Sequence, residues 1–189
     1  FFTHEIIPVN IPQRKGDPIV IDTDEHPRAS TTLEGLAKLK PVVTAEGTVT
    51  AGNASGINDG AAAVLIASEQ AVEQYQLKPR AKIIASTAVG VEPRIMGFAP
   101  APAIKKLLKQ ANLTLEQMDV IELNEAFAAQ ALAVTRDLGL ADDTTQVNPN
   151  GGAIAIGHPL GASGARLVTT ALNQLEQTGG TYALCSMCI

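Results

Sequence analysis

From about residue 57 onward, segments typical of buried strands alternate with segments typical of helices. The strand-like segments are short and largely apolar, whereas in the helical segments apolar residues recur every three or four positions. Strands that alternate with helices predict a layered α/β fold. The expected strands are 61–67, 81–88, 120–123 and the segment from Thr181, and the expected helices are 69–76, 101–111, 125–138 and 162–177.

Local signals mark the ends of several expected helices. Ser68 is suited to cap the helix that follows it. Thr114 and Gln117 have the spacing of a capping box, which predicts a short helical turn there. Gly139 is expected to end the alanine-rich helix that starts at Glu125.

Residues 1–56 differ from the rest of the chain. They contain five prolines and a mixed run of charges over 13–28, with little sustained periodicity. Such a segment is typical of loops packed on another unit. We therefore expect no independent core in this part of the chain.

Composition and charge exclude several classes of function. The chain has 14 basic and 19 acidic residues, a formal net charge of −5, which argues against a nucleic-acid-binding protein. The longest uninterrupted apolar run, 61–67, is far too short to cross a bilayer, so no membrane segment is expected. Two cysteines form no disulfide framework, and a reducing cytoplasm is the default compartment.

The two cysteines, Cys185 and Cys188, have the C-x-x-C spacing of some redox and zinc sites. A redox pair of this kind usually opens a helix, but here the surrounding residues resemble a strand, on which the two thiols would point to opposite faces. A zinc site would need a second pair of ligands, and the three histidines have no suitable spacing. We therefore expect no metal site.

Three segments carry polar residues or glycines where a ligand could approach the chain. Segment 50–60 is rich in small residues and includes Ser55, but it also fits an ordinary turn cluster. Asn124 follows an expected strand, so it either caps the next helix or points into a site at the carboxyl end of the strand. Segment 148–164 is a glycine-rich loop that contains His158 between a glycine and a proline.

His158 is the strongest catalytic candidate from the residues alone, whereas His4 and His26 lie in the proline-rich part and are not selected. A thiol near an imidazole is a good nucleophile or base, and Cys188 follows the last expected strand. These residues predict a Cys/His site with Asn124 as a hydrogen-bond donor. A generic anion-binding α/β domain would explain the glycines but not this combination.

Four blocks resemble the thiolase family, which consists of acyltransferases that cleave or form 3-oxoacyl-CoA. They are Gly52–Ala63, Asn124–Ala128, Asn150–Gly164 and Cys185–Ile189, and they occur in family order over essentially the whole chain. Segments 31–41 and 147–152 are most similar to the branch that acts on 3-oxoadipyl-CoA. An acetoacetyl-CoA thiolase, or a non-catalytic module of thiolase-like fold that binds acyl-CoA or lipid, remains an alternative.

The resemblance implies a thiolase fold with αβαβα layers and mixed sheets. Residues 1–56 would then be the end of the loop domain that covers coenzyme A. Residues 57–78 would complete the N-terminal half, and residues 79–189 would form a truncated C-terminal half that lacks its final strand. The cysteine nucleophile would lie outside these residues, so we expect the 189-residue chain alone to be inactive.

The resemblance also implies roles for individual residues. His158 matches the histidine that activates the nucleophile, Asn124 the residue that holds a water at the oxyanion, and Cys188 the second cysteine, which moves protons. Ser55 and Ala51 match contacts to pantetheine, and Met96 and Phe127 match the lining of the acyl pocket. Coenzyme A and acyl-CoA would be substrates, with no tightly bound cofactor, and the assembly would be a homodimer or homotetramer.

Overall fold

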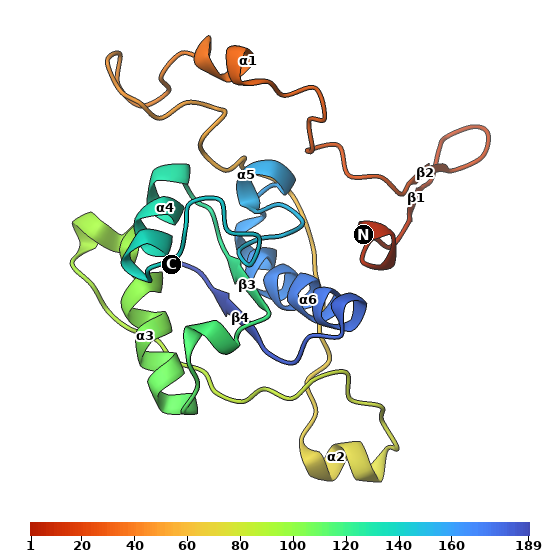
Figure 1. The fold of residues 1–189 in the computed structure, drawn as a ribbon. Helices are drawn as coiled ribbons and strands as arrows, with labels where there is room; N and C mark the ends of the chain where they lie inside the picture. The colour runs from red at the N-terminus through yellow and green to blue at the C-terminus, as the bar shows by residue number, and fades with distance from the viewer.

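The computed structural model describes residues 1–189, and a pair of parallel strands lies at its centre (Figure 1). Strand β3, Val120–Leu123, pairs with strand β4, Ala183–Ser186. Helix α6, Leu160–Thr178, covers one face of this pair, whereas α3, Pro100–Ala111, and α4, Ala128–Asp137, lie on the other side (Figure 1). This layering confirms the α/β class expected from the sequence.

Strand β3 is buried on both faces, and the two faces differ in character. Side chains alternate across a strand, so Ile121 and Leu123 enter the apolar core, whereas Glu122 contacts Arg166 of α6. All four residues of the strand are buried. The core that includes Ile121 and Leu123 lies between the strands and α3 and α4, and its members are Ala101, Ile104, Met118, Ile121, Leu123, Val134 and Leu184.

Several predicted elements are confirmed with small shifts in their ends. The predicted capping box at Thr114 and Gln117 is present and opens the short 3-10 helix η3, Leu115–Gln117. Ser68 caps α2, Glu69–Gln74, through a hydrogen bond from the Ala71 amide. Helix α3 carries Ile104 in the core with Leu107 and Leu108 packed beside it, as the periodicity indicated.

Two predicted strands are wrong. Segments 61–67 and 81–88 form no strand, and most of their residues are exposed, including Leu65 and Ile83. A strand needs a neighbour whose N–H and C=O groups complete its hydrogen bonds, and no segment within residues 1–189 pairs with either run. Apolar composition alone predicted the strands, but pairing decides whether they form.

The start of α4 also differs from the prediction. The helix begins at Ala128 instead of Glu125, with Phe127 as its N-cap. Asn124 is therefore not the cap of this helix. At the other end Gly139 has φ +77°, a left-handed conformation that glycine adopts freely, and it terminates the helix as predicted.

Residues 1–56 have little regular structure and no buried residue, as expected. One feature was not predicted: a short antiparallel hairpin of β1, Val9–Ile11, and β2, Ile19–Ile21. The remaining short elements of the chain are η1, Phe2–His4, α1, Leu33–Ala37, η2, Pro93–Phe98, and α5, Ala153–Ile156. None of the helices combines the length and the apolar character that a membrane crossing requires.

Shortening Ile121 should destabilise the protein in steps, because its side chain is 1% exposed in the core. We expect Ile121→Val to cost about 0.5–1.5 kcal/mol and Ile121→Ala about 2–5 kcal/mol of unfolding free energy. Thermal and denaturant unfolding of the two variants measure this series. Equal stability of all three proteins would contradict the assigned core.

Candidate active site

The three polar segments selected from the sequence meet at the carboxyl end of β3. The Ser55 amide donates to the Ala126 carbonyl at 3.0 Å, and the Ala128 amide donates to the Asn53 carbonyl at 2.8 Å. Ile57 forms a parallel bridge with His158. Segment 50–60 is therefore held between the start of α4 and the glycine-rich loop, so the three segments form one site.

Asn124 extends the parallel ladder beyond β3 and points its side chain toward the glycine-rich loop. Its backbone amide donates to the Ser186 carbonyl at 2.9 Å, and its Nδ2 lies 3.3 Å from His158 Nε2. The residue is fully buried, and its Oδ1 has no hydrogen-bond partner. Of the two roles the sequence left open for Asn124, the structure excludes the cap of α4, and the role in a site stays a prediction.

His158 is 9% exposed, and both of its ring nitrogens are engaged. Nδ1 lies 2.6 Å from Ser163 Oγ, and that hydroxyl donates its proton to the Pro159 carbonyl at 3.1 Å. Since the single hydroxyl proton is used there, Ser163 Oγ accepts from Nδ1–H. Nε2 then carries the lone pair and accepts from the Asn124 amide, so the hydrogen bonds select one neutral tautomer.

The environment of His158 favours this neutral form. Burial lowers the pKa of the imidazole, and the positive charge of Arg166 lowers it further. A histidine whose pKa lies below its usual value of about 6.5 is uncharged at neutral pH. His158 therefore presents a buried, oriented base at the end of β3.

Two residues that the sequence did not select hold the backbone of the histidine loop. The His158 amide donates to Asn58 Oδ1 at 3.0 Å, and Asn58 Nδ2 lies 3.2 Å from His26 Nδ1. His26 Nε2 in turn lies 3.3 Å from the Ile154 carbonyl. Gly157 permits this approach: its φ is +92°, and a Cβ there would lie 2.6 Å from Asn58 Oδ1.

His26 was not selected as a catalytic candidate, and its contacts here support the loop without any catalytic role. The contacts of Asn58 span 32 and 100 positions of the chain, so no local pattern reveals them. The only available signal was that Asn58 lies within the glycine-rich segment 50–60.

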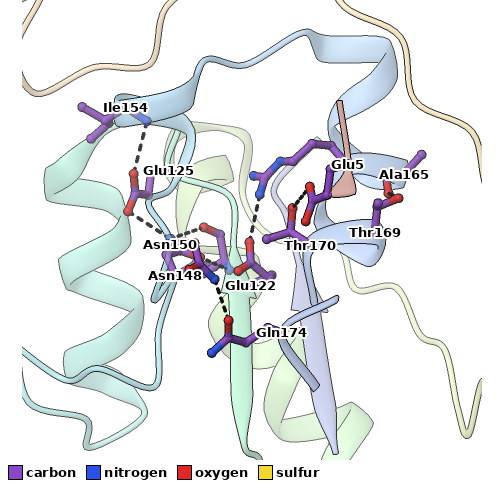
Figure 2. Close-up of polar contacts among 12 residues, drawn as sticks. Glu5, Glu122, Glu125, Asn148, Asn150, Ile154, Ala165, Thr169, Thr170 and Gln174 are labelled. Atoms are coloured by element: carbon purple, nitrogen blue, oxygen red, sulfur yellow. Dashed lines mark hydrogen bonds and ion pairs between the residues drawn. The ribbon is translucent and has the colours of Figure 1, made fainter. Parts of the chain in front are cut away.

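Asn148 and Glu125 support the same loop from the side of the strand, as Figure 2 shows. The Asn148 side chain bonds both the amide and the carbonyl of Leu123, at 2.9 and 2.8 Å, and also Glu125 Oε1 at 2.9 Å. Glu125 Oε2 accepts from the Ile154 amide at 3.2 Å. Glu125, expected in the first turn of a helix, instead joins β3 to the loop that carries His158.

The two cysteines do not act as a pair. Cys188 is buried two residues beyond β4, whereas Cys185 lies in β4 opposite Glu122, and both are free thiols. Burial raises the pKa of Cys188, and burial together with Glu122 raises the pKa of Cys185 to about 12. Both are therefore protonated at neutral pH, and no hydrogen bond joins Cys188 to His158.

The expected binding residues are distributed around the site. Met96 lines a cavity of about 450 Å³ that also contacts Ile189, the residue after Cys188. Phe127 is half-exposed at the start of α4 and is not part of that cavity. Ser55 is half-buried beside Ala126, and Ala51 is exposed on a turn. The binding roles of these four residues stay predictions.

Removal of the Asn58 side chain should loosen the histidine loop. We expect Asn58→Ala to increase amide hydrogen exchange at His158 and in the peptide around it, because the acceptor of the His158 amide is lost. Exchange measured by mass spectrometry on a protein that carries these residues tests this. Unchanged protection of the loop would show that Asn58 does not hold it.

Comparison with known proteins identifies the family. The model for the thiolase C-terminal domain matches residues 77–189, and the model for the thiolase N-terminal domain matches residues 1–70. A beta-ketoadipyl-CoA thiolase of Acinetobacter baylyi is 87% identical over the whole chain, which covers 47% of that protein. The 3-oxoadipyl-CoA/3-oxo-5,6-dehydrosuberyl-CoA thiolase of Escherichia coli is 58% identical, with 98% of this chain and 46% of that protein covered.

Solved structures agree with this assignment. The acetyl-CoA acetyltransferase of Bacillus anthracis superposes with a TM-score of 0.93 at 44% identity, covering 100% of this chain and 47% of that one. Human mitochondrial 3-ketoacyl-CoA thiolase in complex with CoA gives 0.84 at 44% identity, covering 96% and 44%. The chain spans about half the length of the curated relatives it matches. By its sequence and by its fold, the chain belongs to the thiolase family.

Proposed function

We propose that these residues form the proton-transfer part of a thiolase active site, which cleaves a 3-oxoacyl-CoA with coenzyme A. The observation that carries this proposal is the buried chain of hydrogen bonds from Asn124 through His158 to Ser163. It gives an uncharged base whose Nε2 lone pair accepts from the Asn124 amide, and release of that hydrogen bond frees the lone pair to take a proton from a thiol.

In this proposal His158 Nε2 removes the proton of a cysteine that lies outside these residues. The resulting thiolate attacks the 3-oxo carbon of the substrate. The bond between the α and β carbons then breaks, which leaves an acyl-cysteine thioester and the enolate of acetyl-CoA. Burial and the charge of Arg166 support the first step, because both keep His158 unprotonated at neutral pH.

Asn124 supports the developing negative charge on the thioester oxygen. By resemblance to the family, it holds a water that donates to this oxygen, and such donors stabilise an oxyanion most strongly in a buried site. The unpartnered Oδ1 of Asn124 is consistent with this role, since it leaves an acceptor available for the water.

Cys188 acts as the acid and base of the second half of the reaction. Its protonated thiol donates to the enolate carbon to give acetyl-CoA, and its thiolate then takes the proton of the incoming coenzyme A. The coenzyme A thiolate attacks the acyl-cysteine and releases the shortened acyl-CoA. The cysteine leaves as a thiolate and takes its proton back from His158. The raised pKa of Cys188 supports its role as the proton donor.

The names of the relatives favour 3-oxoadipyl-CoA as the substrate. The human relative solved with CoA supports coenzyme A as a ligand. We assign pantetheine contacts to Ser55 and Ala51 and the acyl pocket to Met96 and Phe127. By resemblance, the complete enzyme would be a homodimer or homotetramer.

The roles of His158 and Cys188 are separable in a completed chain, in which these residues replace the corresponding segment of the Acinetobacter baylyi relative. We expect His158→Ala to slow formation of the acyl-enzyme by about 100-fold or more, since the general base is lost. Cys188→Ser should still form the acyl-enzyme but should not complete the carbon–carbon step. Mass spectrometry of the acyl-enzyme and spectrophotometric thiolysis of 3-oxoadipyl-CoA measure the two steps.

The assay includes acetoacetyl-CoA as a second substrate and Thr178→Ala, at the far end of α6, as a surface control. Loss of the acyl-enzyme in Cys188→Ser but not in His158→Ala would show that the two roles are reversed. If the completed chain binds acyl-CoA without turnover, the proposed catalytic function is wrong and a binding module is favoured.

A further inference from the structure

A buried ion pair lies beside the proposed site, and neither of its residues gives or takes a proton in the mechanism above. Arg166 Nη1 donates to Glu122 Oε2 at 2.9 Å, where the Glu122 side chain is fully buried and that of Arg166 is 16% exposed. Two further atoms of the pair, Glu122 Oε1 and Arg166 Nη2, are buried without a partner. A buried pair with unmet hydrogen bonds is weak evidence for a role in stability, so its position is more informative.

The ion pair joins α6 to β3, and residues at the ends of these same two elements bond the His158 ring. Arg166 lies one helical turn after Ser163 on α6, and Ser163 bonds His158 Nδ1. Glu122 lies two residues before Asn124, on the same face of β3, and Asn124 bonds His158 Nε2. Two connections therefore join α6 to the strand side. One passes through the His158 imidazole, and the ion pair between Arg166 and Glu122 is the neighbouring one.

We propose that Arg166 is a positioning residue: held by Glu122, its guanidinium keeps the His158 imidazole uncharged and fixes α6 against β3, so that Ser163 and Asn124 hold opposite ring nitrogens. The consequence for reaction rate rests on the proposed function. The effect of Arg166 on the charge of the imidazole is independent of the proposed function.

The electrostatics follow from which charges surround the ring. Arg166 is the cation whose charge disfavours a second positive charge on His158. The carboxylates of this region come from several elements: Glu122 from β3, Glu125 from the β3–α4 junction, and Glu5 next to η1, which accepts from Thr170 Oγ1 at 2.9 Å (Figure 2). Cys185 on β4, Cys188 just beyond it and His26 on the N-terminal segment are further titratable groups near the loop and its strand.

Glu122 does not fully cancel the charge of Arg166. Burial raises the pKa of Glu122 to about 7, with smaller contributions from the negative charges of Glu5 and Glu125. When Glu122 takes up a proton, it no longer carries a charge that offsets that of Arg166. The guanidinium charge is then unbalanced, and it opposes protonation of the imidazole in the pH range where that protonation would stop its action as a base.

Charge-selective variants of the completed chain test this proposal. The pKa of His158 is measured by NMR with ¹³C-labelled histidine, and its signal is assigned by its loss in His158→Asn. We expect Arg166→Gln to raise the pKa of His158, and Arg166→Lys to restore a low value because it keeps the charge. Glu122→Gln should leave the pKa at or below that of the unmodified protein, because the guanidinium charge remains.

A purely structural ion pair would behave differently, since either substitution breaks it. An upward shift in both Arg166→Gln and Glu122→Gln, or in neither, would overturn the proposal. If Arg166→Gln does not fold, the double variant Glu122→Gln/Arg166→Gln replaces it, because two amides can bond in the same place without a buried charge. Its His158 pKa should lie above that of Glu122→Gln, and equal values would overturn the proposal.

The matched control is Glu176→Gln, which removes a carboxylate on the same helix from its exposed ion pair with Arg80. It should not move the pKa of His158. In parallel, the acid limb of acyl-enzyme formation should shift to higher pH in Arg166→Gln and not in Glu122→Gln. If the completed chain shows the NMR shifts but no thiolysis, the proposed function fails and the positioning role stands. If the completed chain shows thiolysis but no NMR shifts, the positioning role of Arg166 fails and the proposed function stands.

Discussion

The site depends on one short chain of hydrogen bonds that passes through the His158 imidazole. Asn124 on the strand side and Ser163 on the helix side hold opposite nitrogens of the ring. This requires α6 to lie at a fixed distance and register from β3. The parallel pairing of β3 with β4 continues through the Asn124 amide, so the position of the asparagine is set by the central sheet itself.

The two faces of β3 have different roles: one packs in the apolar core, and the other carries buried polar side chains. The face toward α3 and α4 is apolar, and burial of Ile121 and Leu123 there stabilises the fold. The face toward α6 carries Glu122 and Asn124, both fully buried, and each retains an oxygen without a partner. Unmet buried hydrogen bonds cost free energy. The presence of such atoms on both Glu122 and Asn124 is consistent with a functional site on this face of the strand.

Sequence patterns predicted much of this architecture. The α/β class, strand 120–123, the helix at 101–111 and the capping box at Thr114 all depend on local signals, and all are present. The selection of Asn124 and His158 as neighbours came from residue chemistry and family resemblance, and a hydrogen bond between them supports it. Buried strands at 61–67 and 81–88 were wrong, because strand formation depends on a pairing partner and not on apolar composition.

The residues that escaped prediction are those whose partners are distant in the chain. His26 and Asn58 act on the histidine loop from segments far before it, and Arg166 reaches Glu122 across 44 positions. Glu125 was assigned to a helix start because a carboxylate there suits the helix dipole, yet it bonds Asn148 and Ile154. In each case the residue type was visible in the sequence, but its partner was fixed only by the packing of loop, strand and helix.

The tautomer of His158 is the most direct test of this account. Nitrogen-15 NMR of the labelled imidazole in the completed chain distinguishes a protonated ring nitrogen from one that carries a lone pair. The hydrogen bonds to Ser163 and Asn124 predict a proton on Nδ1 and a lone pair on Nε2 at neutral pH. A proton on Nε2, or a doubly protonated ring at that pH, would contradict the account.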